Sequence, residues 1–123
     1  MELMNYFFDS YAVIEIASGS PYYAKFIEEV PVIPIFNLAE IYWSAINHLN
    51  EEEADEIYDK YSNCIAEIPD EILKEAIRFR KDNKKKDLSY TDCIGYIYAL
   101  RNNMLFLTGD KEFQGMKNVE FVK

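Results

Sequence analysis

The chain has 123 residues, half of them hydrophobic and 15% of them aromatic, so it can bury a core and is not a disordered polypeptide. Its net charge of −9 argues against binding phosphates by overall attraction, although residues 78–86 concentrate six basic residues and one acidic residue. No apolar run reaches the roughly 20 residues of a membrane span. The N-terminal residues lack the basic start and cleavage site of a secretion signal, so we expect a single cytosolic domain over residues 1–123, without membrane association.

Five apolar segments have the composition of short buried strands. They lie at residues 5–8, 30–35, 64–69, 104–107 and 119–122. The segments between them have helical patterns, with start signals such as Pro21 and stop signals such as Gly19. These expected helices lie at residues 10–19, 21–30, 37–50, 51–62, 70–86, 89–103 and 111–115.

The clearest helix, residues 37–50, has an apolar stripe at helical spacing, with Asn37 as its expected N-terminal cap. The strand at residues 30–35 is less regular, because Pro31 and Pro34 lack the N–H that a sheet needs. Strands separated by helices indicate crossover connections, and hence a parallel sheet with helices on both faces. The sequence therefore predicts an α/β fold with a five-stranded parallel sheet.

Four acidic residues occupy positions where carboxylates can converge. Asp9 comes directly after the first expected strand, and Asp110 follows the fourth after two residues. The ligand crevice of an open parallel sheet lies beyond the carboxyl ends of its strands, so these two carboxylates meet there if the strands are neighbours. Glu40 and Asp92 lie in the first turns of their expected helices, where the helix dipole favours anions.

Such a cluster suits a divalent metal ion. Like charges at short range cannot all stay ionised without a counter-charge, and oxygen ligands suit Mg²⁺ or Mn²⁺. Two such ions can activate a water and stabilise the leaving oxygen in phosphodiester hydrolysis. His48 is the only histidine, and Cys64 and Cys93 are isolated and expected to be reduced thiols. A histidine-based metal cage and a Ser-His-Asp triad are therefore disfavoured.

Each acid also has a purely structural explanation. Asp9, Asp92 and Asp110 can each cap the helix that follows it. Glu40 can be an ordinary first-turn acid. Gly109 would permit a sharp or left-handed turn just before Asp110. A functional site is favoured because all four acids occur at strand ends or helix starts.

Three segments together resemble PIN domains, and in particular the VapC-type toxin ribonucleases. These are FFDSYAVIEI at residues 7–16, NLAEIYW at residues 37–43 and LSYTDCIGYIYALRNNMLFLTGDKEF at residues 88–113. The resemblance covers residues 6–122, and the third segment is its most specific part.

The resemblance implies a site made of four acids, with a hydroxyl group next to the first acid and another near the last. The matching residues are Asp9, Glu40, Asp92 and Asp110 as metal ligands, with Ser10 and Thr108 as the hydroxyl groups. It also implies a three-layer sandwich with sheet order 3-2-1-4-5, Mg²⁺ or Mn²⁺ dependence and cleavage of single-stranded RNA. The implied partners are a second copy in a homodimer and a small antitoxin protein. The chain departs from the pattern in its acidic net charge, so a nuclease of this kind must hold RNA through local basic patches.

Other functions fit parts of the same pattern. A non-catalytic PIN-like module that binds RNA or a protein would need no metal site, and the intact set of four acids argues against it. A phosphatase with an aspartyl nucleophile requires an aspartate two residues after Asp9, where this chain has Tyr11. The basic run at residues 78–86 is also explained as a solvated helix end. The aromatic residues are expected in the core and a dimer interface, with Tyr22 and Tyr23 as candidates for lining a groove.

Overall fold

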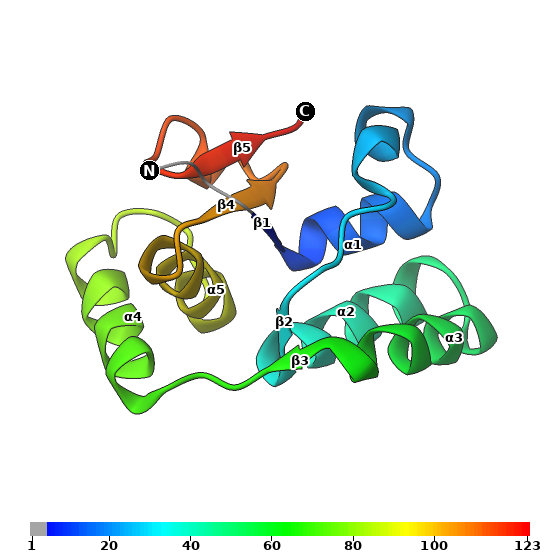
Figure 1. Ribbon diagram of the computed structural model, residues 1–123, viewed down its shortest axis with the longest axis horizontal. Coiled ribbons are helices and arrows are strands. Elements are labelled where there is room, and N and C mark those ends of the chain that lie inside the picture. The colour runs from blue at the N-terminus through cyan, green and yellow to red at the C-terminus, as the bar shows by residue number, and fades with distance from the viewer. Residues whose placement is uncertain (1–4) are drawn as a thin grey trace.

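The computed structural model describes residues 5–123 (Figure 1). Its strands are β1 (Asn5–Phe8), β2 (Ile33–Pro34), β3 (Ile65–Ala66), β4 (Met104–Thr108) and β5 (Val119–Phe121). Its α-helices are α1 (Ser10–Ala17), α2 (Ile35–His48), α3 (Glu51–Tyr61), α4 (Asp70–Asp82) and α5 (Tyr90–Arg101). Short 3-10 helices are η1 (Pro21–Phe26), η2 (Ser62–Cys64) and η3 (Lys111–Phe113). Within residues 5–123, none of the helices combines the length and the apolar character needed to cross a membrane.

The central sheet is parallel and has β4 in its middle, between β1 and β5. Phe8, the last residue of β1, pairs with Leu107 of β4. The backbone N–H of Asp9 then donates to the carbonyl of Leu107 at 3.0 Å. The carboxyl ends of β1 and β4 therefore meet at one edge of the sheet, as the strand order implied by the family resemblance requires.

The expected continuous five-stranded sheet in the order 3-2-1-4-5 differs from the structure. β2 pairs with β3 in a separate parallel ladder, and no ladder among residues 5–123 joins β2 to β1. Pro31 and Pro34 remove two hydrogen-bond donors from this segment, which explains why β2 has only 2 residues. The pairs β1–β4, β4–β5 and β2–β3 are nonetheless neighbours in the predicted order.

The central sheet carries a hydrophobic core on each face. Phe7 and Phe106 belong to the core shared with α4 and α5, whereas Phe8 and Leu107 belong to the core shared with α1, η1 and α2. This division follows from the alternation of side chains along a strand. Helix α5 approaches the sheet closely because Gly95 has no side chain: a Cβ there would lie 2.8 Å from Cε1 of Phe7. The prediction of helices on both faces is correct.

Several elements begin or end at other residues than expected. Helix α2 begins two residues early with Pro34 at its N-cap, so Asn37 is not the cap but a buried residue inside the helix. Glu40 consequently lies in the second turn. Of the expected helix at residues 21–30 only η1 forms, and of the expected strand at residues 64–69 only β3 forms.

Candidate metal centre

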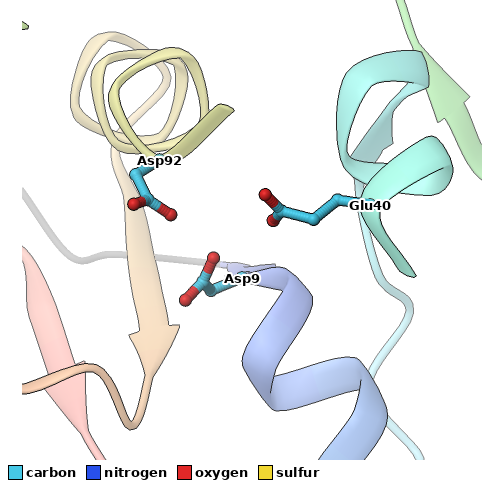
Figure 2. Close-up of side chains that lie close together, drawn as sticks. All are labelled: Asp9, Glu40 and Asp92. Carbon is cyan, nitrogen blue, oxygen red and sulfur yellow. The ribbon is translucent and has the colours of Figure 1, made fainter. Parts of the chain in front are cut away.

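Asp9, Glu40 and Asp92 bring three carboxylates together at the carboxyl edge of the central sheet. Each offers one oxygen, and these oxygens all lie within 4.8 Å of one another. The three side chains point toward one another from the start of α1, from α2 and from α5 (Figure 2). Because hard divalent cations take oxygen ligands at about 2.0–2.6 Å, this spacing suits a shared ion.

Asp9 is the most firmly held of the three acids. It is 3% exposed, the Thr108 hydroxyl donates to its Oδ2 at 2.7 Å, and the backbone N–H of Ser10 donates to its Oδ1 at 2.9 Å. Asp9 therefore caps α1, so its structural explanation is correct, yet the same carboxylate also belongs to the cluster. Each oxygen keeps a lone pair for a further ligand.

Asp92 is fixed by a capping box at the start of α5. The backbone N–H of Ser89 donates to Oδ2 of Asp92 at 2.9 Å, and the backbone N–H of Asp92 donates to the Ser89 hydroxyl at 3.0 Å. Glu40 differs, because no hydrogen bond from residues 5–123 holds its carboxylate. It is consequently the most adaptable member of the cluster.

Burial makes the charged form of this cluster costly. Burial raises the pKa of Asp9 from its ordinary value of 3.8 to about 7, and the charges of Asp92 and Glu40 add to the rise. Burial also raises the pKa of Asp92 to about 6, with further contributions from Glu40 and Asp110. A cation among these carboxylates would remove the repulsion and favour their ionised forms. A donor set made only of oxygens fits Mg²⁺ or Mn²⁺.

Asp110 lies at the rim of the cluster. It lines the same pocket of about 450 Å³ as the three acids, but it is not among the carboxylates that lie within 4.8 Å of one another. Its Oδ1 accepts from the backbone N–H of Glu112 at 2.9 Å, so it caps η3 as its structural explanation predicted. Its own N–H donates to Oγ1 of Thr108 at 3.0 Å. Thr108 thus connects Asp9 to Asp110, the residue that the family resemblance implied as the fourth metal ligand.

Gly109 is required by a close approach and not by its backbone conformation. Of the sharp or left-handed turn that Gly109 would permit, the left-handed form is excluded, because Gly109 does not have a positive φ. A Cβ at Gly109 would lie 2.4 Å from Cε1 of Tyr11 and 2.8 Å from the carbonyl oxygen of Val122. The chain between β4 and Asp110 therefore passes directly against Tyr11.

Asn37 joins α2 to α1 behind the acids. It is fully buried, and its Nδ2 donates to Oγ of Ser10 at 3.3 Å. Asn37 stands three residues before Glu40, and Ser10 directly follows Asp9. Its Oδ1 has no hydrogen-bond partner among residues 5–123. This contact sets the spacing between the helices that carry two of the three acids.

The pocket has further lining residues that the sequence reasoning missed. They are Tyr11, Ser44 and Lys111. Ser44 follows Glu40 by one helical turn, so the i+4 spacing could have found it. Tyr11 and Lys111 are near neighbours of Asp9 and Asp110, and Lys111 brings a positive charge to the rim. The expectation that Tyr23 lines a groove is wrong, because Tyr23 is buried and its hydroxyl donates to the carbonyl of Val122 at 3.1 Å.

Comparison with protein families matches residues 6–119 to the PIN domain. The chain belongs to the PIN domain family. Among solved structures, this PIN domain is similar to a chain described as "Toxin-antitoxin complex from Klebsiella pneumoniae". The TM-score is 0.71 at 20% identity, over 95% of this chain and 96% of that chain, so the two share a fold. The search of curated proteins found no match.

Proposed function

We propose that the chain is a metal-dependent endoribonuclease that cleaves single-stranded RNA, with Mg²⁺ or Mn²⁺ as its cofactor. The observation that carries the proposal is the cluster of Asp9, Glu40 and Asp92 in a PIN domain. These carboxylates come from the N-cap of α1, from α2 and from α5, and Lys111 is the one cationic side chain among the described residues that line their pocket. A bound cation explains this arrangement well, because it would offset the electrostatic repulsion among the three carboxylates.

Asp9, Glu40 and Asp92 would hold the metal, and Asp110 is the candidate for a fourth ligand at the rim. Bound Mg²⁺ or Mn²⁺ supplies an activated water and stabilises the leaving oxygen of a phosphodiester. Thr108 assists by donating to Asp9, because this hydrogen bond favours the ionised carboxylate. Ser10 assists through its contact with Asn37, which positions Asp9 relative to α2. Lys111 offers a cation to the phosphate at the pocket rim.

The test of this function is cleavage of a mixed pool of single-stranded RNA by the purified chain. We expect products with Mg²⁺ or Mn²⁺, none in excess chelator, and little cleavage of duplex RNA. Cleavage that survives the chelator would contradict the metal mechanism. An inactive protein that still binds RNA or another protein would leave the non-catalytic PIN-like module as the better explanation.

We also assign the chain to toxin–antitoxin pairs of the VapC type, with a small antitoxin protein as partner. The structural neighbour described as a toxin-antitoxin complex supports this assignment. An antitoxin segment that reaches the pocket should carry Arg or Lys, because a cation can occupy the place of the metal among the carboxylates. Expression of the chain alone should arrest growth of a bacterial host, and Asp9→Asn should relieve the arrest.

A homodimer completes the proposed assembly, and the α2 surface is our candidate interface. Helix α2 exposes several large apolar side chains, with exposed fractions between 41% and 63%: Ile35, Phe36, Trp43 and Ile46. Apolar side chains gathered on one helix are typical of interfaces. Sedimentation should show a dimer at micromolar concentration, and Trp43→Lys should shift the population toward monomer. A strict monomer for the parent chain would contradict the dimer.

A further inference from the structure

An exposed aromatic ring is held in place beside the acid cluster. Tyr90 is the first residue of α5 and is 58% exposed. The guanidinium of Arg80 lies over its ring, with Cζ 4.2 Å from the ring centroid, and Nε of Arg80 donates to the carbonyl of Leu88 at 3.0 Å. The cation–π contact and the hydrogen bond fix the geometry of the pair. Core packing does not account for a large aromatic side chain that remains this exposed.

The pair stands next to the site and not inside it. Tyr90 precedes Asp92 by two residues in the first turn of α5, where Cα atoms two residues apart are about 5 Å from each other. Residues two apart face different sides of a helix. A group stacked on Tyr90 would therefore lie outside the acid cluster, on a ring that is anchored in the same helical turn as Asp92.

Arg80 also belongs to the one strongly basic segment of the sequence, and Tyr90 follows that segment by four residues. Residues 78–86 contain six basic residues and one acidic residue, while the rest of the chain has 7 basic and 21 acidic residues. The end of this segment is anchored at the pocket: Nζ of Lys86 donates to the carbonyl of Glu112 at 3.0 Å, one residue after the pocket-lining Lys111. Within residues 5–123 the salt bridge joins Arg101 to Glu75, and no cation of this segment forms one.

We propose that Tyr90 and Arg80 bind a nucleotide that flanks the cleaved bond of single-stranded RNA. The base stacks on the open face of Tyr90, while Arg80 and the neighbouring lysines contact the backbone phosphates. Such a combination of aromatic ring and cationic track is how single strands are bound without sequence selection. The inference rests on the proposed function for its choice of RNA as ligand. It explains how a chain of net charge −9 holds a polyanion: the positive charge is concentrated beside the metal ligands.

The test measures binding of a fluorescently labelled single-stranded RNA 12-mer of mixed sequence, in chelator so that no metal-dependent cleavage occurs. We expect Tyr90→Ala to weaken binding about fivefold or more, and Tyr90→Phe to restore it. Arg80→Ala should weaken binding and also reduce the slope of log K against log salt by about 0.7, as loss of one phosphate contact requires. Tyr58→Ala and Lys60→Ala, an aromatic and a cationic substitution on α3, serve as matched controls and should bind like the parent.

Thermal melts of all variants separate a binding role from a purely structural one. Parent-like binding by Tyr90→Ala would overturn the inference, and so would a parent chain that binds no single strand or prefers duplex RNA. If the parent cleaves RNA in a metal-dependent manner but Tyr90→Ala binds RNA like the parent, the nucleotide site is refuted and the proposed nuclease function stands. Tyr90-dependent binding without any cleavage would refute the nuclease and leave the nucleotide site. If Tyr90→Ala weakens binding of single-stranded DNA as much as binding of single-stranded RNA, the result supports base stacking. Tighter binding of DNA than of RNA by the parent would overturn RNA as the ligand.

Discussion

Thr108 donates a hydrogen bond of 2.7 Å to Asp9 across 99 residues of sequence. The same oxygen of Thr108 accepts the backbone N–H of Asp110 at 3.0 Å. A single buried hydroxyl group thus ties the first acid of the cluster to the loop that carries the acid at its rim. The contact exists because β1 and β4 are parallel neighbours whose carboxyl ends coincide.

Thr108→Val keeps the shape of this side chain and removes both hydrogen bonds. We expect the metal-free protein at pH 8 to lose about 1–3 kcal/mol in free energy of unfolding, because an ionised acceptor and a partly buried N–H lose their partner. The pKa of Asp9 should rise further, since the Thr108 hydrogen bond lowers it. The pH profile of metal-dependent cleavage should move to higher pH, and Thr108→Ser should restore it. An unchanged profile in Thr108→Val would contradict this role.

Stability of the metal-free protein should fall as the pH rises from about 4 to about 7. In this range the raised pKa of Asp9 lets the folded chain keep a proton that the unfolded chain has already lost. Asp92, with its pKa raised to about 6, acts in the same direction at the lower end. The expected loss is up to about 1.4 kcal/mol per pH unit for each group, and a few kcal/mol in total.

Denaturant unfolding in chelator at pH 5 and pH 8 checks this dependence. Asp9→Asn should flatten it, because the asparagine does not titrate, and saturating Mg²⁺ should restore stability to the parent at pH 8. Free energy of unfolding that rises from pH 5 to pH 8 in the metal-free parent would contradict the assigned pKa shifts.

Gly109→Ala should damage the pocket through steric overlap. The new methyl group would meet Cε1 of Tyr11 at 2.4 Å and the carbonyl of Val122 at 2.8 Å, and the backbone carbonyl cannot move aside easily. We expect a loss of about 1–3 kcal/mol in stability and a strong loss of cleavage activity. Gly115→Ala is the contrast: it has open space but a φ of 85°, so it should cost only about 1 kcal/mol and spare activity. Equal effects of the two substitutions on activity would refute the close-approach explanation.

Asn37→Ala should affect the site more than the fold. The substitution removes the hydrogen bond to Ser10 but also removes the unpaired Oδ1, so stability should change by no more than about 1–2 kcal/mol. Glu40 would lose its fixed spacing to Asp9, so the concentration of Mn²⁺ needed for half-maximal cleavage should rise severalfold. Asn47→Ala, on the exposed side of the same helix, is the control. A parent-like metal requirement in Asn37→Ala would show that this contact does not position the acids.

The sequence predicted the parts of this fold that depend on local pattern. The sequence predicted β1 with Asp9 directly after it, and β4 with Asp110 shortly after it. These features were predictable because an apolar strand and the polar residue at its end are adjacent in the chain. The sequence could not predict the burial of Asn37. An asparagine that caps a helix and an asparagine buried inside one differ only in their tertiary contacts. The close approach at Gly109 depends on Tyr11 and Val122, which are distant in sequence. The division of the sheet depends on whether a proline-containing segment finds a partner strand, which local pattern cannot decide.

The most direct test of the central claim compares RNA cleavage by the parent and by Asp9→Asn at saturating Mg²⁺ or Mn²⁺. The substitution keeps the size of the side chain and one acceptor oxygen, and it removes the charge that would hold the metal. Asp59→Asn, an exposed acid on α3 outside the cluster, is the matched control. We predict that Asp9→Asn lowers the cleavage rate by orders of magnitude while its metal-free thermal stability at pH 8 equals or exceeds that of the parent. Full activity in Asp9→Asn would show that these carboxylates are not the metal centre of a ribonuclease.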